Sequence, residues 1–418
     1  MQSDINSSKK KPVAVILVGI GGMGFFYLKS LLKDFHPHEV NLQGTVDPYP
    51  ERSGLFSELK NLNIPVFSSL EELFQNQPSP ELTIISSPLH FHVRQSCLAL
   101  QKGSHVLCEK PLAATVQDAD SLIQLEKRSG NWVMIGYQWS FSDAIQSLKK
   151  DILKGLFGRP LRFKSLCLWH RDLKYYRRCD WAGKIKAPDG SWILDSPANN
   201  AMAHYLHNLL YLAGDSQISS SSPVEITAEA NRAYPIESYD TVACRAFTQN
   251  QVEILFYASH AVKDDRGPVF QLEFSEAQVG YDASKGIIEA VSKQGKRKKY
   301  GSPDIDPMKK LNYAVQMVKQ RLPVLCGSEA ARAQTLSING IQESASGINA
   351  FPDNMIDNKS KTSRNVRGLE DLLTFCYQDN TLPSESGLNW SKKGKRMDLQ
   401  TYAYFPGGLD PAAHEERK

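Results

Sequence analysis

The chain has 418 residues, which is too many for one ordinary hydrophobic core and therefore predicts two domains. Hydrophobic residues make up 41% and charged residues 22% of the sequence, as in a typical water-soluble globular protein. The net charge of +4 is too small, and too evenly spread, to indicate a nucleic-acid-binding protein.

The sequence favours a cytoplasmic protein with no membrane partner. Residues 1–11 are polar, lack the apolar centre of a signal peptide and are expected to be disordered. No apolar run approaches the ~20 residues that span a bilayer. The seven cysteines are scattered without a C-x-x-C pair, which indicates reduced thiols. Two internal basic clusters, residues 293–299 and 392–396, are expected to form solvated turns.

The first strand and helix predict a dinucleotide site. The β-branched run Val13–Val18 is typical of a strand buried on both faces, and a helix is expected over 25–32. Between them lies a G-x-G-x-x-G loop, in which the first glycine permits a tight turn, the second lets a pyrophosphate approach and the third lets the helix pack closely. The cofactor-binding residues predicted here are Gly19, Ile20, Gly21, Gly22, Met23 and Gly24.

Asp47 ends the second predicted strand, 40–46, about 20 residues after the loop, where a carboxylate can accept a hydrogen bond from a ribose 2′-hydroxyl. A carboxylate repels a 2′-phosphate, so the cofactor expected is NAD. Arg52 nearby keeps NADP as an alternative.

Strands and helices go on alternating to about residue 138, which predicts a doubly wound parallel sheet, a Rossmann NAD(P)-binding domain over 12–138. Ligands bind outside the carboxyl ends of such strands. Residues 87–92 and 109–111 both follow strands and should share one rim with the glycine loop. The helices expected are 51–61, 69–74, 93–102 and 118–129, and the further strands 64–67, 82–85, 105–108 and 132–136.

The pattern then changes to successive strands, which predicts a substrate-binding α/β domain over 139–354 with an open, mostly antiparallel sheet. An uncovered sheet face predicts a homo-oligomer, a dimer or tetramer through that sheet. Residues 355–418 are a C-terminal extension, whose last 40 residues should wrap on the body or be partly disordered. The helices expected are 144–154, 199–212, 307–321, 328–337 and 367–377, and the strands 161–169, 224–234, 241–248, 251–260, 269–274, 280–282 and 286–291.

Four motifs in this order resemble those of the Gfo/Idh/MocA family, that is, glucose–fructose oxidoreductase, inositol dehydrogenase and their relatives. The resemblance is specific over residues 12–140 and looser to about 350. It implies an NAD(P)-dependent oxidoreductase that acts on a carbinol of a sugar, polyol or sugar derivative. The matching motifs are Val18–Gly24, Asp47-Pro48, Ser87–His92 and Gly103–Leu112.

The resemblance also implies site residues. Lys110 should lie beside the nicotinamide and the reacting hydroxyl, and His204 should transfer the proton. Ser87, Pro88, His92, Glu109 and Lys110 should border the cofactor. The residue types fit, because a histidine has a pKa near working pH and a lysine can stabilise a developing alkoxide.

Asn200 departs from the family pattern, in which an Asp stands four residues before the histidine. An amide cannot titrate but can hydrogen-bond a substrate hydroxyl, and i, i+4 spacing on a helix would let Asn200 and His204 face one substrate. His207 replaces a second Asp of the relatives. Asp195 is either a replacement carboxylate or a loop residue. The i, i+3 spacing of His204 and His207 suits a metal, but no third ligand is evident, so no metal is expected.

The segment 169–181 is rich in aromatic and cationic residues, of which Tyr176, Arg178 and Trp181 are the predicted substrate-binding residues together with Asn200 and His204. The alternative is a packed or partner-facing loop. Two other functions stay open at this point: a hydrolase or lyase that retains NAD and oxidises a sugar transiently, and a non-catalytic NAD- or sugar-binding regulatory protein.

Overall fold

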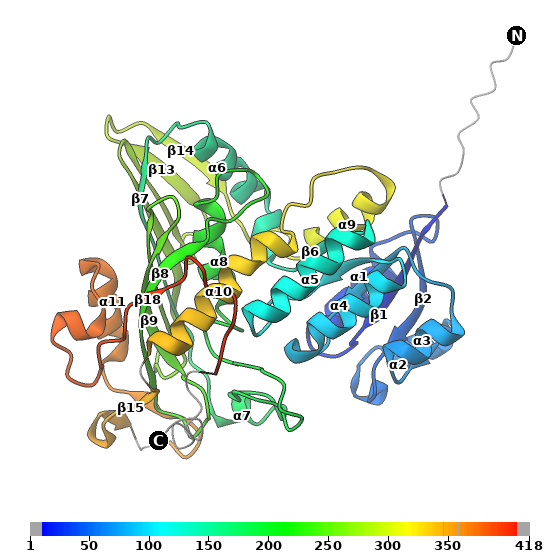
Figure 1. Cartoon of the computed structure of the whole chain (residues 1–418), viewed down its shortest axis with the longest axis horizontal. Helices are drawn as coiled ribbons and strands as arrows, with labels where there is room; N and C mark the ends of the chain where they lie inside the picture. The colour runs from blue at the N-terminus through cyan, green and yellow to red at the C-terminus, as the bar shows by residue number, and fades with distance from the viewer. Residues whose placement is uncertain (1–10, 346, 358–359, 408–418) are drawn as a thin grey trace, which may run out of the picture.

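A computed structural model describes residues 11–407 except 346, 358 and 359 (Figure 1). The predicted disordered N-terminus lies outside the described residues apart from Lys11, as does the part of the C-terminal extension after Gly407. Among the described residues, no helix is long and apolar enough to cross a membrane.

The N-terminal part forms a six-stranded parallel sheet in the order β3-β2-β1-β4-β5-β6, which confirms the predicted Rossmann topology. All six residues of β1 are buried, as its unbroken apolar run predicts. The strands are β1 (Val13–Val18), β2 (Val40–Val46), β3 (Val66–Phe67), β4 (Leu82–Ile85), β5 (His105–Cys108) and β6 (Val133–Ile135). The helices between them are α1 (Met23–Lys33), α2 (Phe56–Asn61), α3 (Leu70–Asn76), α4 (His92–Gln101) and α5 (Val116–Ser129).

The prediction of a helix over 51–61 is wrong for the first half of that range. Residues Pro50–Arg52 form a short 3-10 turn, η1, and the backbone of Ser53 is extended. The Ser53 hydroxyl donates to the Ile20 carbonyl at 2.9 Å, which holds this segment against the glycine loop and delays the helix to Phe56.

A helix from far along the chain completes the N-terminal core. α9 (Lys309–Lys319) contacts β1, β4 and β5, although it follows all the long strands of the second sheet (Figure 1). Its apolar face, Leu311, Ala314 and Val315, is buried in the same cluster as β1. The start of the second part, η3 (Gln138–Phe141) and α6 (Asp143–Leu153), leads from β6 into the other sheet.

The second part is a ten-stranded mixed sheet in the order β14-β13-β12-β11-β7-β10-β9-β8-β15, with β18 beside β8. Neighbouring strands are antiparallel except for the pairs β7–β10 and β8–β15, so the expected mostly antiparallel sheet is confirmed. α8 (Ala203–Leu212) and α10 (Ser328–Ser344) pack on the face nearer the first domain (Figure 1). The strands are β7 (Pro160–Leu168), β8 (Pro223–Arg232), β9 (Thr241–Thr248), β10 (Glu253–Ser259), β11 (Arg266–Phe274), β12 (Ala277–Asp282), β13 (Ile288–Ser292), β14 (Arg297–Gly301), β15 (Asn349–Ala350) and β18 (Met397–Asp398).

Three expected elements of this part differ in the structure. The basic cluster 293–299 is only partly a turn, because residues 297–301 form the edge strand β14, paired with β13 and bearing Arg297 beside Glu289 at 2.8 Å. Charged side chains on an edge strand discourage further pairing. α10 runs on to Ser344, seven residues beyond the expected end, and its N-cap is Gly327. α8 starts at Ala203, so residues 199–202 form turns before the helix.

The C-terminal segment, described over 351–357 and 360–407, wraps on the mixed sheet, as expected for an extended tail. Its part up to Trp390 packs on the outer face, and residues 397–407 pass the β8 edge to the inner face, where Leu399 and Phe405 join the cluster of α8 and α10. The segment carries α11 (Leu369–Asp379), which packs on β7 and β10 (Figure 1). It also includes the short pair β16 (Ile356–Asp357) and β17 (Asn365–Val366) and the turn η5 (Pro383–Ser386). Alternate residues of the strands, such as Leu255 and Tyr257, point into a separate apolar cluster with Leu369 and Leu373.

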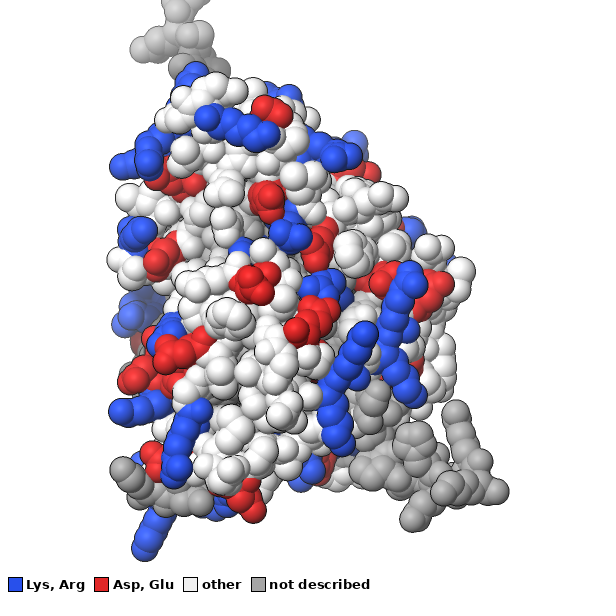
Figure 2. Space-filling model, turned by 90° about the vertical axis from the view of Figure 1, so that its left-hand side faces the viewer, with Lys and Arg blue, Asp and Glu red and all other residues white. Residues whose placement is uncertain are grey.

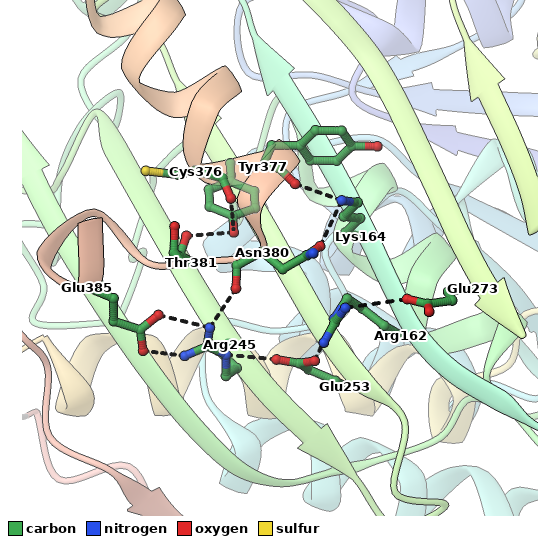
Figure 3. Close-up of polar contacts among 11 residues, drawn as sticks. Arg162, Lys164, Arg245, Glu253, Glu273, Cys376, Tyr377, Asn380, Thr381 and Glu385 are labelled. Atoms are coloured by element: carbon green, nitrogen blue, oxygen red, sulfur yellow. Dashed lines mark hydrogen bonds and ion pairs between the residues drawn. The ribbon is translucent and has the colours of Figure 1, made fainter.

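Buried polar groups hold this segment to the sheet (Figure 3). Lys164, 6% exposed, donates from Nζ to the Tyr377 carbonyl and to Asn380 Oδ1, both at 2.7 Å, and so caps the end of α11. Arg245 donates to Glu253 Oε1 at 2.8 Å and forms a second ion pair with Glu385. This part of the outer face is therefore occupied by the chain itself. Figure 2 shows acidic and basic side chains interspersed over the surface on this side.

Candidate active site

The glycine loop has the geometry of a phosphate-binding turn. Gly19 has a φ of +82°, and a Cβ there would lie 2.7 Å from the Ser86 carbonyl oxygen. A Cβ on Gly24 would lie 2.0 Å from the Gly19 oxygen, so α1 approaches β1 as closely as the motif requires. A Cβ on Gly21 or Gly22 would meet no atom within 4 Å. Open space therefore faces the loop at the start of α1, where free N–H groups attract a phosphate.

Asp47 lies beside this loop, as expected. Its Oδ2 accepts from the Ile20 N–H at 3.0 Å and its Oδ1 from the Tyr49 N–H at 2.9 Å. Each oxygen keeps a free lone pair, so the carboxylate can still accept from a ribose hydroxyl. Arg52 is exposed and its guanidinium stacks 4.3 Å from the centroid of the Tyr49 ring.

His92 joins the two loops that were expected to border the cofactor. It is 2% exposed, with Nδ1 2.8 Å from the Pro111 carbonyl and Nε2 3.0 Å from the Ser87 carbonyl. Burial lowers the pKa of His92, and the contacts with the Pro111 and Ser87 carbonyls oppose this shift. Ser87 donates to Gln95 at 2.5 Å, and Pro88 precedes the turn η2 (Leu89–Phe91). The structure thus brings Ser87, Pro88 and Glu109 to one rim, while the ring of His92 is engaged by backbone.

A hydrogen-bonded chain runs from Lys110 into the second domain. Lys110 Nζ donates to the Asn200 carbonyl at 2.8 Å and lies 3.2 Å from Asn200 Oδ1. Asn200 Nδ2 in turn donates to Asp195 Oδ1 at 2.8 Å, and Asp195 Oδ2 accepts from the Gly183 N–H at 2.6 Å. Asp195 is 2% exposed, so a buried carboxylate faces the lysine through one amide. Asp195 is therefore a member of the site network rather than a free loop residue.

Burial dominates the acid–base properties of this network. It lowers the pKa of the Lys110 ammonium to about 8, with Glu109 opposing the shift. It raises the pKa of Asp195, against the opposing hydrogen bonds of Gly183 and Asn200. At neutral pH Lys110 is mainly protonated, and two of its three N–H groups point to Asn200, which leaves one donor for a substrate oxygen.

His204 lies on the first turn of α8 with its ring edge-on to Tyr137, the centroids 5.8 Å apart. Burial, followed by the charges of Lys110 and Lys310, lowers the pKa of His204 well below 6.5. The imidazole is therefore neutral and can accept a proton. Asn200 precedes the helix, so the expected helical i, i+4 relation is wrong, and Asn200 reaches the site from the preceding turn instead.

His207 is buried behind His204. Its Nε2 lies 3.1 Å from Ser140 Oγ and 3.4 Å from Cys326 Sγ, and its ring stacks on Tyr137 at 3.9 Å. Burial lowers the pKa of His207 to about 3. Among the described residues, no group of three His, Cys, Asp or Glu side chains could hold a metal ion.

Sequence reasoning missed Lys310. This side chain of α9 is 1% exposed, and its Nζ forms an ion pair with Glu109 and donates to the Gly136 carbonyl at 3.2 Å. Glu109 also accepts from the Tyr27 hydroxyl at 2.8 Å and from the Lys110 N–H at 3.2 Å. Lys310 thus supports the backbone that carries Lys110. The one sequence signal was a lysine inside the apolar stripe of a predicted helix.

The predicted substrate residues occupy different environments. Tyr176 is 9% exposed and packs 5.0 Å from the Tyr234 ring in the apolar cluster beneath the C-terminal segment. Trp181 packs against the cluster of Leu89, Ala187 and Ile193, next to the cofactor loops. Arg178 is exposed and stacks over the ring of Tyr175.

Comparison with known proteins supports the resemblance. Residues 13–137 match the model of the GFO_IDH_MocA family, described as an oxidoreductase family with an NAD-binding Rossmann fold. A curated relative, 1-carboxy-3-chloro-3,4-dihydroxycyclohexa-1,5-diene dehydrogenase of Comamonas testosteroni, is 30% identical over 34% of this chain and 35% of its own. Inositol 2-dehydrogenase of Rubrobacter xylanophilus is 28% identical over 38% of this chain and 44% of its own. The chain thus spans less than half the length of these relatives.

Solved structures extend the likeness to the second domain. The WlbA dehydrogenase of Bordetella pertussis, in complex with NADH and UDP-GlcNAcA, superimposes with a TM-score of 0.65 at 19% identity, covering 80% of this chain and 97% of the other. At 19% identity, this similarity shows that the two proteins share a fold.

Proposed function

We propose that the chain is an NAD-dependent dehydrogenase, because residues 13–137 match the model of the Gfo/Idh/MocA family of oxidoreductases with an NAD-binding Rossmann fold. It transfers a hydride between the nicotinamide and a carbinol of a sugar, polyol or sugar derivative. The observation that carries the proposal is the series of hydrogen bonds from Lys110 through Asn200 to Asp195. It joins the rim of the Rossmann sheet to the turn before His204.

The residues around the glycine loop fit the cofactor. The space before Gly21 and Gly22 and the start of α1 suit a pyrophosphate, and Asp47 suits an unphosphorylated ribose. NAD, when bound, supplies the hydride acceptor. Arg52 is engaged with Tyr49 rather than with Asp47, so NADP is the alternative that the assay must separate.

His204 and Lys110 divide the proton chemistry. The neutral imidazole of His204 takes the proton of the reacting hydroxyl, which a ring with a lowered pKa can do throughout the neutral range. The remaining N–H of the Lys110 ammonium donates to the same oxygen and stabilises the negative charge that develops there. Asn200 and Asp195 fix the position of that ammonium. His92 holds the loop of Lys110 through Pro111.

Purified protein would be mixed with NAD or NADP and a panel of sugars, inositols and sugar acids while reduced nicotinamide is followed by its absorbance. We expect NAD to be reduced with one substrate class. The rate should fall at least ~10²-fold in Lys110→Met and in His204→Asn, as for other groups that act in the transition state. Lys102→Met, an exposed lysine at the end of α4, is the matched control and should be unaffected. Cofactor binding without net reduction would point to an enzyme that retains NAD, and failure to bind either cofactor would refute the proposal.

Assembly and location belong to the same proposal. We propose that any self-association through the mixed sheet uses its uncovered strands β11–β14, since α11 already covers β7 and β10. All seven cysteines have free thiols, which suits the reducing cytoplasm expected from the sequence.

A further inference from the structure

Two arginines share one tyrosine ring at the edge of the candidate site. The guanidinium carbon of Arg178 lies 3.7 Å from the centroid of Tyr175, and that of Arg171 lies 5.2 Å from the same centroid. Arg178 is also 5.1 Å from the Trp181 ring, and Arg171 is 5.7 Å from the Trp169 ring. Stacking on aromatic faces fixes both cations while their N–H edges stay free.

Among the described residues, no carboxylate forms an ion pair with Arg171 or Arg178. The Arg171 guanidinium donates to the His170 carbonyl at 2.8 Å. The Arg178 guanidinium donates to the Tyr175 carbonyl at 2.6 Å and also interacts with the Tyr175 hydroxyl. A guanidinium has five N–H donors, so both side chains keep donors for a ligand. The nearby carboxylate of Asp172 caps α7 (Leu173–Tyr176), where it accepts from the Tyr175 N–H at 3.1 Å.

Arg178 of this pair lies at the same site as Lys110. Trp181, on which Arg178 stacks, packs against the cluster that contains Leu89 of the cofactor-side loop. The segment then reaches Gly183, whose N–H binds Asp195. The charge of Arg178 is close enough to contribute to the lowered pKa of Lys110 and to oppose the rise in the pKa of Asp195. The Asp195 carboxylate of this network already accepts from the Asn200 amide and from the Gly183 N–H.

We propose that Arg178 and Arg171 bind an anionic group of the substrate, so that the proposed dehydrogenase acts on a sugar derivative bearing a carboxylate or a phosphate rather than on a neutral sugar. The inference rests on the proposed function and deepens it. A planar guanidinium pairs with either anion through two parallel hydrogen bonds, and both cations stack on the same Tyr175 ring without an ion pair to a described carboxylate.

A binding measurement tests this inference independently of catalytic turnover. The protein loaded with NADH would be titrated by calorimetry with matched sets: glucose, glucuronate and glucose 6-phosphate, and the same three forms of galactose and mannose. We expect one anionic form to bind at least 10-fold more tightly than its neutral parent, and its identity shows whether the anion is a carboxylate or a phosphate. Arg178→Gln should lower the affinity for that anionic sugar roughly 10- to 100-fold. Arg171→Gln should lower this affinity less, because Arg171 lies farther from its aromatic rings than Arg178 does.

The neutral parent sugar is the internal control, since its affinity should stay within about twofold in both variants. Arg177→Gln is the matched variant, because Arg177 is exposed, adjacent to Arg178 and stacked on no ring. In turnover, Arg178→Gln should raise KM and leave kcat within about threefold. The inference is overturned if no anionic form binds better than its parent, or if Arg178→Gln leaves anion affinity unchanged. Reduction of NAD by a neutral sugar with no anion preference would overturn it while leaving the dehydrogenase proposal intact.

Discussion

Replacement of Lys310 by methionine tests whether the buried ion pair supports the Lys110 loop. The side chains of Lys310 and Glu109 are 1% and 8% exposed, so the variant leaves a carboxylate in the protein interior without its cation. Methionine is unbranched and similar in length, so little of the effect comes from lost packing. Removing one partner of a buried pair costs about 3–5 kcal/mol of folding free energy.

The neighbouring residue provides the control. Lys309 forms an ion pair with Asp143, whose side chain is 90% exposed, so Lys309→Met should cost less than about 1 kcal/mol. Urea unfolding followed by circular dichroism measures both variants at pH 7.5, in the transition that includes the N-terminal sheet. A double variant, Glu109→Gln with Lys310→Met, should recover most of the loss because it leaves no buried charge.

The pH dependence gives a second check. Burial alone would raise the pKa of Glu109, but Lys310 and other donors hold it below its usual range. Without Lys310, burial raises this pKa in the folded state above the unfolded value of about 4.3. The penalty is then full above the raised folded-state pKa, falls as the pH drops from that value toward the unfolded one, and vanishes below it. The reasoning would be refuted if Lys310→Met lowered the free energy of unfolding as little as Lys309→Met does. It would also be refuted if the decrease for Lys310→Met were the same at pH 7.5 and at pH 4.

Three further outcomes are expected. Gly24→Ala should abolish NADH binding, measured by fluorescence, and destabilise the fold by at least about 1–3 kcal/mol, because its Cβ would lie 2.0 Å from the Gly19 oxygen; unchanged binding would contradict this. kcat/KM for oxidation should be flat down to well below pH 6.5, where His204 becomes protonated, and should fall above about pH 8 as Lys110 loses its proton; a rise through pH 8 would instead make neutral Lys110 the base. Arg245→Ala should lower the free energy of unfolding by about 2–4 kcal/mol and increase proteolysis of the C-terminal segment. Arg396→Ala, which removes the ion pair of an exposed arginine with Glu225, is the control and should have little effect.

Local sequence signals predicted most of the N-terminal architecture. The apolar run of β1, the spacing of the glycines and the position of Asp47 are short-range features, and their geometry follows from backbone sterics. The helix expected over 69–74 is also found as α3, and Ser69 caps it by accepting from the Glu72 N–H at 3.1 Å. The rim shared by the glycine loop and Lys110 followed from the rule on strand ends.

Contacts between distant segments could not be derived in this way. Nothing near Glu109 in the sequence indicates that its partner is Lys310, because the pairing depends on the return of α9 to the first sheet. The start of α8 was misplaced because the turns 196–202 are stabilised by tertiary contacts, including the hydrogen bond from Lys110 to the Asn200 carbonyl. The roles of Tyr176, Arg178 and Trp181 stay predictions, although burial now favours packing for Tyr176.

The path of the C-terminal segment also has a consequence for biosynthesis. Met397 of β18 pairs with Ile226 of β8, and the backbone of Phe405 exchanges hydrogen bonds with the Gln117 side chain. At synthesis rates of roughly 5–20 residues per second, β8 leaves the ribosome about 10–30 s before β18 exists to cover its edge. An unpaired strand edge is a template for aggregation. Part of the β8 edge, at Glu225 and Ile226, therefore stays open in the growing chain until β18 has been made, even after β15 has paired with Asn231 and Arg232.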